Sequence, residues 1–384
     1  MSSSAIEINE RKKWKTLPSM KTPRQHFVAT AIGQKIFVAG GLNGKREILS
    51  SAEVYDIQSN EWSPLPNMDM ARYGGAATSI NGKFYVIGGY DGSGYPSGEM
   101  FDPATNKWRT IPDMKERREK YAACAIGDKI YIMGGRVDNS RFSSSAEVFD
   151  TETQKWSSMP GMTSQRRSCT AVSVNDKIYV FWGDGFVIGS HSSAEGYDIT
   201  SQQWTQLPEL KEKRTDFAAT VVGNKIYFIG GFDSSGHLSS CEVFDTSTNG
   251  WSSSVPDMEV GKFVCQAVTI GTKIFAIWNS IFHAPSFLKV YETKSDNNDD
   301  IRAVGSDRLA QLSISQNDQK ISSSMTVHQR VLYLEKHVGI EYDPSTLLIR
   351  RIESLETNIY GESKNTDEAI QARIDNLEAS LFDK

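Results

Sequence analysis

The chain has 384 residues, of which 39% are hydrophobic and 23% are charged, and its formal net charge is −5. No apolar run is long enough to span a bilayer, and the first residues lack the apolar stretch of a secretory signal. We therefore expect a cytoplasmic protein. The balance of 42 basic and 47 acidic residues carries no electrostatic footprint for nucleic acid or an anionic membrane, so neither is expected as a partner.

The first predicted element is a short outer strand at residues 14–18, which no inner strands precede. It opens a repeat. Tryptophan recurs at steps of 46 to 48 residues, at Trp14, Trp62, Trp108, Trp156, Trp204 and Trp251. Seven residues before each of the last five lies an aromatic residue, followed directly by Asp and preceded two positions earlier by Glu. These aromatics are Tyr55, Phe101, Phe149, Tyr197 and Phe244.

Each unit also contains a short β-branched and aromatic run that ends in a glycine doublet, as in residues 36–41, 84–89, 130–135 and 226–231. Such runs between polar clusters predict strands, and about four of them fit in each unit. A unit of this size matches one propeller blade. Stacking blades in a ring would bury the aromatic residues between neighbours, so packing explains the recurring tryptophan without a ligand.

The glycine doublet, the Glu-x-aromatic-Asp step and the Trp seven residues later resemble the kelch repeat, from Trp14 to Met258. The resemblance implies an all-β propeller. It also implies that the N-terminal strand at residues 14–18 completes the last blade, as is common in kelch propellers. The four cysteines, Cys124, Cys169, Cys241 and Cys265, are scattered in or beside predicted strands, so we expect reduced, buried thiols and no metal site.

The repeat becomes degenerate toward the C-terminus. The fourth unit has Phe181-Trp182-Gly183-Asp184 in place of its doublet, and the sixth unit lacks the tryptophan. A polar insertion follows at about 295–324, and a seventh unit is legible in residues 331–334 and 341–344. We predict seven blades within residues 1–347. The alternative is six blades, with Ser295 onward outside the ring.

The periodicity changes after Leu347. Leu348, Ile352, Leu355 and Ile359 recur 22 residues later as Ile370, Ile374, Leu377 and Leu381. Their spacing of three and four predicts two short amphipathic helices in residues 348–384. Helices this short must pack on something, either the same chain or a second copy in a homodimer.

A basic residue stands at one fixed place in each unit: Arg24, Arg72, Arg118, Arg166, Arg214 and Lys262. Two interpretations remain open. These residues could form a positively charged face for an acidic protein or peptide. Alternatively, each Arg could pair structurally with the repeated Glu, because the first five units carry both residues. Departures from the repeat add further candidate contacts, and the candidate partner-binding residues are Arg72, Tyr73, Tyr90, Arg117, Arg118, Arg136, Arg166, Arg167, Arg214 and His237.

We expect a non-catalytic interaction scaffold or substrate adaptor that binds a protein or peptide on one face, with no cofactor. The alternative is an enzyme on the kelch fold, such as a sugar mutarotase. The six histidines are irregularly placed and show no ligand cluster of the kind that copper-radical oxidases need. Thr220 stands where the iron-dependent specifier proteins carry a His, and the glycine doublets end strands instead of cradling phosphates.

Overall fold

The computed structural model describes residues 13–90, 96–137, 141–181, 193–209, 214–233, 236–252, 255–258, 266–279 and 286–293. The chain divides into two compact units, Met1–Asp296 and Asn297–Lys384, and every described residue belongs to the first. The expected seventh unit, the C-terminal helices and the polar insertion all lie outside the described residues. Among the described residues, no helix is long and apolar enough to cross a membrane.

Six four-stranded antiparallel sheets form the blades. Blade 1 contains β2 (Val28–Ile32), β3 (Lys35–Ala39), β4 (Ala52–Asp56) and β5 (Glu61–Leu65). Blade 2 contains β6 (Ala76–Ile80), β7 (Lys83–Ile87), β8 (Gly98–Asp102) and β9 (Lys107–Ile111). Blade 3 contains β11 (Ala122–Ile126), β12 (Lys129–Met133), β15 (Ala146–Asp150) and β16 (Lys155–Met159).

The other three blades follow the same order from inside to outside. Blade 4 contains β17 (Thr170–Val174), β18 (Lys177–Phe181), β19 (Ala194–Asp198) and β20 (Gln203–Leu207). Blade 5 contains β21 (Ala218–Val222), β22 (Lys225–Ile229), β25 (Cys241–Asp245) and β26 (Gly250–Ser252). Blade 6 contains β27 (Gln266–Ile270), β28 (Lys273–Asn279), β29 (Ser286–Glu292) and β1 (Lys15–Leu17). Short pairs at the blade ends are β10 (Arg118–Glu119), β13 (Arg136–Val137), β14 (Arg141–Phe142), β23 (Phe232–Asp233) and β24 (Gly236–His237).

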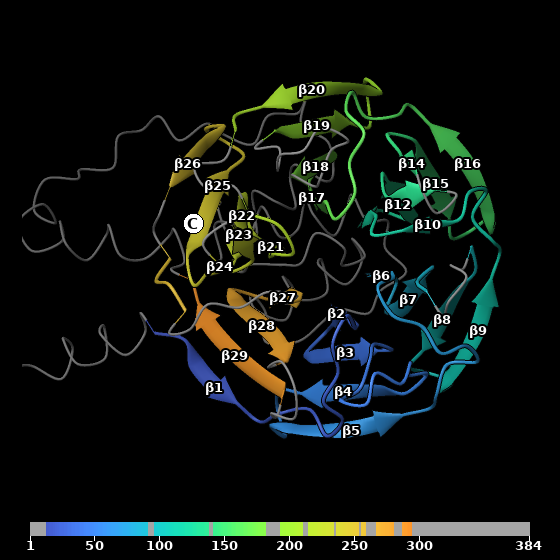
Figure 1. Cartoon of the computed structure of the whole chain (residues 1–384), viewed down its shortest axis with the longest axis vertical. Helices are drawn as coiled ribbons and strands as arrows, with labels where there is room; N and C mark the ends of the chain where they lie inside the picture. Colours follow the sequence, from blue (N-terminus) through green and yellow to red (C-terminus); the bar gives the residue numbers. More distant parts are fainter. Residues whose placement is uncertain are drawn as a thin grey trace, which may run out of the picture. The chain divides into compact units, whose positions relative to one another are not determined.

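The innermost strands close a ring of six blades (Figure 1). Each contacts the innermost strand of the next blade, from β2 through β6, β11, β17, β21 and β27 and back to β2. Because β27 contacts β2 directly, no seventh blade fits between the sixth blade and the first. The expectation of seven blades is therefore corrected to the six-blade alternative.

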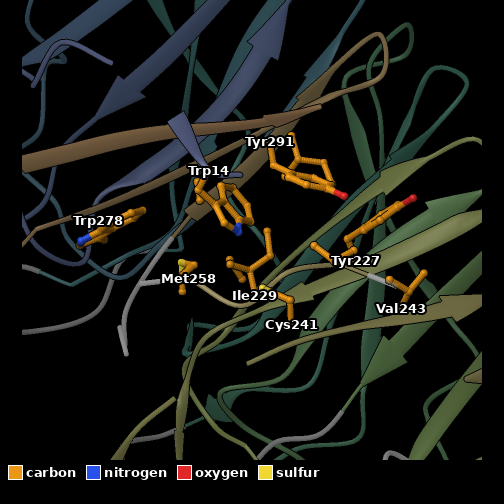
Figure 2. Packing of buried hydrophobic residues seen from close by; sticks show 12 residues of the cluster. Trp14, Tyr227, Ile229, Cys241, Val243, Met258, Trp278 and Tyr291 are labelled. Carbon is orange, nitrogen blue, oxygen red and sulfur yellow. The ribbon is translucent and has the colours of Figure 1, made fainter. Parts of the chain in front are cut away.

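The N-terminal strand completes the last blade, which confirms the predicted closure. Strand β1 is antiparallel to β29, with Lys15 opposite Val290 (Figure 1). Trp14 is 6% exposed, its ring centroid lies 5.4 Å from that of Tyr291, and its indole N–H donates to the carbonyl of Pro256 at 3.0 Å. Figure 2 shows Trp14 and Tyr291 packed against Tyr227, Ile229 and other residues of blade 5. The closing strand is thus held by a buried cluster as well as by its sheet pairing.

The repeated tryptophans join neighbouring blades. In each blade the indole N–H donates to the carbonyl of the Pro that follows the outer strand of the preceding blade, as Trp62 does to Pro18 at 2.8 Å. The other pairs are Trp108 with Pro66, Trp156 with Pro112, Trp204 with Pro160, Trp251 with Pro208 and Trp14 with Pro256. Every repeated indole N–H is used in this way between blades, so the spacing of Trp and Pro in the repeat follows from how blades are joined.

Candidate partner-binding face

One end of the ring carries the variable segments of every blade. There, the residue after the repeated Arg pairs with the residue after the glycine doublet in all four blades in which both are described. These pairs are Gln25 with Leu42, Tyr73 with Tyr90, Glu119 with Arg136, and Thr215 with Phe232. We call this end the doublet-loop end and these positions the doublet pairs. At the opposite end, short turns join β2 to β3 and β4 to β5.

The repeated arginines do not line this surface. Arg24, Arg72, Arg118, Arg166 and Arg214 are all at most 2% exposed. Their guanidinium groups pair at 2.5 to 2.9 Å with Glu53, Glu99, Glu147, Glu195 and Glu242, respectively. The predicted Arg–Glu pair is confirmed in five blades. Arg72, Arg118, Arg166 and Arg214 are therefore removed from the candidate partner contacts, because burial keeps a partner from reaching them.

Each Arg–Glu pair fastens the loop after the glycine doublet to the turn through which the chain enters the same blade. Arg72 donates through Nη1 to the carbonyls of Gly88 and Ser97 at 2.8 and 2.9 Å. Its partner Glu99 accepts the backbone amides of Asp69 and Met70. In blade 1, burial lowers the pKa of Arg24 and Glu53 opposes this shift. A buried charge without a partner is costly, so the pair fixes both segments together.

The doublet pairs themselves are accessible to water and differ between blades. In blade 2 the rings of Tyr73 and Tyr90 meet edge to face at 5.6 Å, with His26 of blade 1 at 6.1 Å from Tyr73. In blade 3, Arg136 forms an ion pair with Glu119. Blades 2 and 3 are neighbours in the ring; burial raises the pKa of Tyr73, and Tyr90 and Glu119 of blade 3 raise it further.

Phe232 of blade 5 is 43% exposed, and it is the large hydrophobic side chain that stands out as exposed among the described residues. Its ring lies 5.6 Å from that of the candidate residue His237. The sequence analysis missed Phe232. The signal that could have found it is its position directly after the doublet Gly230-Gly231, which is the place that Tyr90 and Arg136 hold in their blades.

The two additional arginines lie on blades 3 and 4. Arg117 is exposed, and the guanidinium of Arg167 sits over the ring of Phe142 at 4.6 Å. Phe142 also lines a cavity of about 480 Å³, together with Lys115, Glu116, Ser144, Met159 and Gln165, among others. Of the ten predicted contacts, Tyr73, Tyr90, Arg117, Arg136, Arg167 and His237 therefore remain at this end. Within the described part of the chain, no group of His, Cys, Asp or Glu side chains could hold a metal ion.

Comparisons with known proteins match this architecture. Residues 120–277 match the family model of the KLHDC2/KLHL20/DRC7 Kelch-repeats domain, and residues 23–69 and 71–115 match the Kelch motif. A stretch of 47 residues is 49% identical to an F-box/kelch-repeat protein of Arabidopsis thaliana, covering 12% of each chain. A stretch of 52 residues is 46% identical to Kelch-like protein 41a of Danio rerio, covering 14% of this chain and 8% of that protein. The matches thus span only a small part of these relatives.

The fold is similar to that of a solved structure, YjhT, with a TM-score of 0.63 at 15% identity, over 73% of this chain and 98% of that one. At this identity the similarity concerns the fold alone. The repeat, the six-blade ring and the matched models all agree, and the chain belongs to the kelch-repeat family of β-propellers.

Proposed function

We propose that this protein binds a protein or peptide partner at the doublet-loop end, as an interaction scaffold or substrate adaptor. The observation that carries the proposal is the set of doublet pairs. They put different, water-accessible side chains at equivalent places on a rigid frame. Tyr, Arg and Phe are residue types that anchor interfaces, and Tyr73, Arg136 and Phe232 are spread over three blades.

The frame supports this proposal energetically. Because the buried Arg–Glu pairs and the backbone bridges hold both segments of each doublet pair, little ordering is needed when a partner arrives. Kelch repeats commonly mediate protein–protein interaction, and the relatives named above are kelch-repeat and kelch-like proteins.

The partner is expected to carry acidic residues that approach blades 3 and 4. Arg117 is exposed there and Arg167 presents its guanidinium on an aromatic ring, so both can meet a carboxylate. Arg117 and Arg167 should attract an acidic segment of the partner toward blades 3 and 4, and salt should weaken this attraction.

The test is quantitative affinity capture with the full-length protein, comparing Arg117→Glu with Arg167→Glu against a matched variant. The matched control, Lys129→Glu with Lys155→Glu, makes the same charge change at the opposite end of blade 3, where both lysines are exposed at strand starts. We expect the first variant to bind captured proteins at least tenfold more weakly, in a salt-dependent way, and the control to bind as wild type. Equal retention by both variants, at unchanged melting temperatures, would place the site elsewhere.

A further inference from the structure

The propeller repeats with a period of two blades as well as one. The third residue after the repeated basic residue is aromatic in blades 1, 3 and 5, as Phe27, Tyr121 and Phe217. The same position in blades 2, 4 and 6 holds a small residue, as Gly75, Cys169 and Cys265.

The interfaces between blades alternate in the same way. Ser79 donates to the carbonyl of Ala31 at 3.0 Å between blades 1 and 2, and Ser173 donates to that of Ala125 at 2.7 Å between blades 3 and 4. Between blades 5 and 6, a hydroxyl–hydroxyl hydrogen bond of 2.7 Å joins Thr220 and Thr269. The other three interfaces each contain one of the aromatic residues. The ring is thus built from three blade pairs.

This pairing decides which side chains stand near the ring axis at the doublet-loop end. The second residue after the repeated Arg is large and titratable on the first blade of each pair: His26, Lys120 and Asp216. We call these three residues the axial triad. The second blades of the first two pairs have Gly74 and Ser168 instead, which donate their backbone N–H groups to the carbonyls of His26 and Lys120 at 2.9 and 2.7 Å.

The triad residues share one backbone conformation. All have positive φ, with 51° for His26, 52° for Lys120 and 48° for Asp216. A side chain at such a φ is uncommon and needs surrounding structure to hold it. Here the innermost strand begins two residues later, and the triad side chains remain exposed.

The ring places the three residues around one axis, because each lies two residues before the innermost strand of its blade. Although part of its surface is exposed, the His26 imidazole is shielded enough by its neighbours that its pKa is lowered; the charge of Asp216 raises this pKa and that of Lys120 lowers it. In a ring of six, blades 3 and 5 lie two positions away from blade 1 on opposite sides. The charges of Lys120 on blade 3 and Asp216 on blade 5 can therefore both act on a side chain of blade 1 only across the ring axis. Lys120 carries a positive charge and Asp216 a negative one, so the triad presents one charge of each sign on two different blades.

We infer that the axial triad selects a partner segment with one acidic and one basic side chain, the acidic one contacting Lys120 and the basic one contacting Asp216. The inference rests on the proposed binding at the doublet-loop end. It specifies that the partner expected there carries a basic side chain as well as acidic ones. A uniformly acidic segment is disfavoured, because Asp216 would repel it.

The test is selection of random 12-residue peptides displayed on phage by the full-length protein, followed by sequencing. Three variants are compared with wild type: Lys120→Asn, Asp216→Asn, and the swap Lys120→Asp with Asp216→Lys. Asparagine tolerates positive φ, so the single variants change charge without adding backbone strain. Unchanged melting temperatures serve as the check on folding.

Wild type should enrich peptides that combine one acidic and one basic residue at a fixed spacing. Asp216→Asn should lose the basic preference at least fivefold, Lys120→Asn should lose the acidic one, and the swap should reverse their order. If Asp216→Asn leaves the enrichment of basic residues unchanged, the triad does not select a charge pair. The proposed peptide-binding face is tested separately, with the double variant Arg117→Glu, Arg167→Glu. If this variant binds every peptide that the wild-type protein enriches, the proposed face itself is refuted.

Discussion

The repeated arginines suggest surface charges in the sequence but are buried ion pairs in the structure. A regularly spaced Arg at a turn suggests a charged surface, yet Arg72 is 2% exposed and bonded to two carbonyls and a carboxylate. The joint occurrence of Arg and Glu in five units indicated the pairing. Burial did not follow from one sequence, because a structural pair and a binding pair show the same residue pattern.

Replacing Arg72 tests this structural role. Arg72→Ala leaves Glu99 buried without its cation, and we expect a loss of about 3–5 kcal/mol in the free energy of unfolding, measured by urea denaturation. The matched control is Lys35→Ala, which removes the exposed pair of Lys35 with Asp56 and should cost about 0–1 kcal/mol. Similar losses in the two variants would mean that the buried pair is not a structural clamp.

At the scale of the element, the turn between the third and fourth strands explains the repeated Asp. Asp150 accepts the backbone amides of Glu152 and Thr153 at 3.1 and 2.8 Å, so it closes the turn from β15 to β16. Four blades carry such an Asp with a lowered pKa, namely Asp56, Asp150, Asp198 and Asp245. The repeat can be recognised from this Asp in the sequence, but its hydrogen bonds become visible only in the folded turn.

Because of these turns, the stability of the protein should decrease at acidic pH. The amide of Thr153 lowers the pKa of Asp150, so its contribution is complete above the ordinary Asp pKa of 3.8 and is lost as the pH falls through the lowered value. The melting temperature should therefore fall steeply below about pH 4. Asp150→Asn keeps an acceptor without the charge and should make this fall shallower. An identical pH profile for both proteins would contradict a role for the charge.

At the scale of the whole molecule, the blade repeat and its closure by the N-terminal strand were predictable, whereas the number of blades was not. The legible unit at residues 331–344 favoured seven, because a single sequence shows strands but not which strands meet. The contact of β2 with β27 joins residues more than two hundred positions apart. The axial triad escaped notice for a related reason, since its members come together only when the ring closes.

Trp14 offers a direct test of closure. Trp14→Ala should lower the free energy of unfolding by about 3–5 kcal/mol, because the indole fills the space between blades 5 and 6. Trp14→Phe keeps an aromatic ring against Tyr291 and loses the hydrogen bond to Pro256, so a loss nearer 1 kcal/mol is expected. Guanidinium denaturation followed by circular dichroism measures both. A wild-type midpoint for Trp14→Ala would show that β1 does not secure the ring.

The pairing of β1 with β29 also sets an order of events during synthesis. Blades 1 to 5 are each continuous in sequence and can form as they leave the ribosome, but Lys15 must wait for Val290. At roughly 5–20 residues per second, that wait is on the order of 14–55 s. Throughout it, Trp14 and the edge of β1 lack their native partners, and an unpaired strand edge is open to other chains. The nascent chain is therefore most exposed to misassembly in the interval before its last blade emerges.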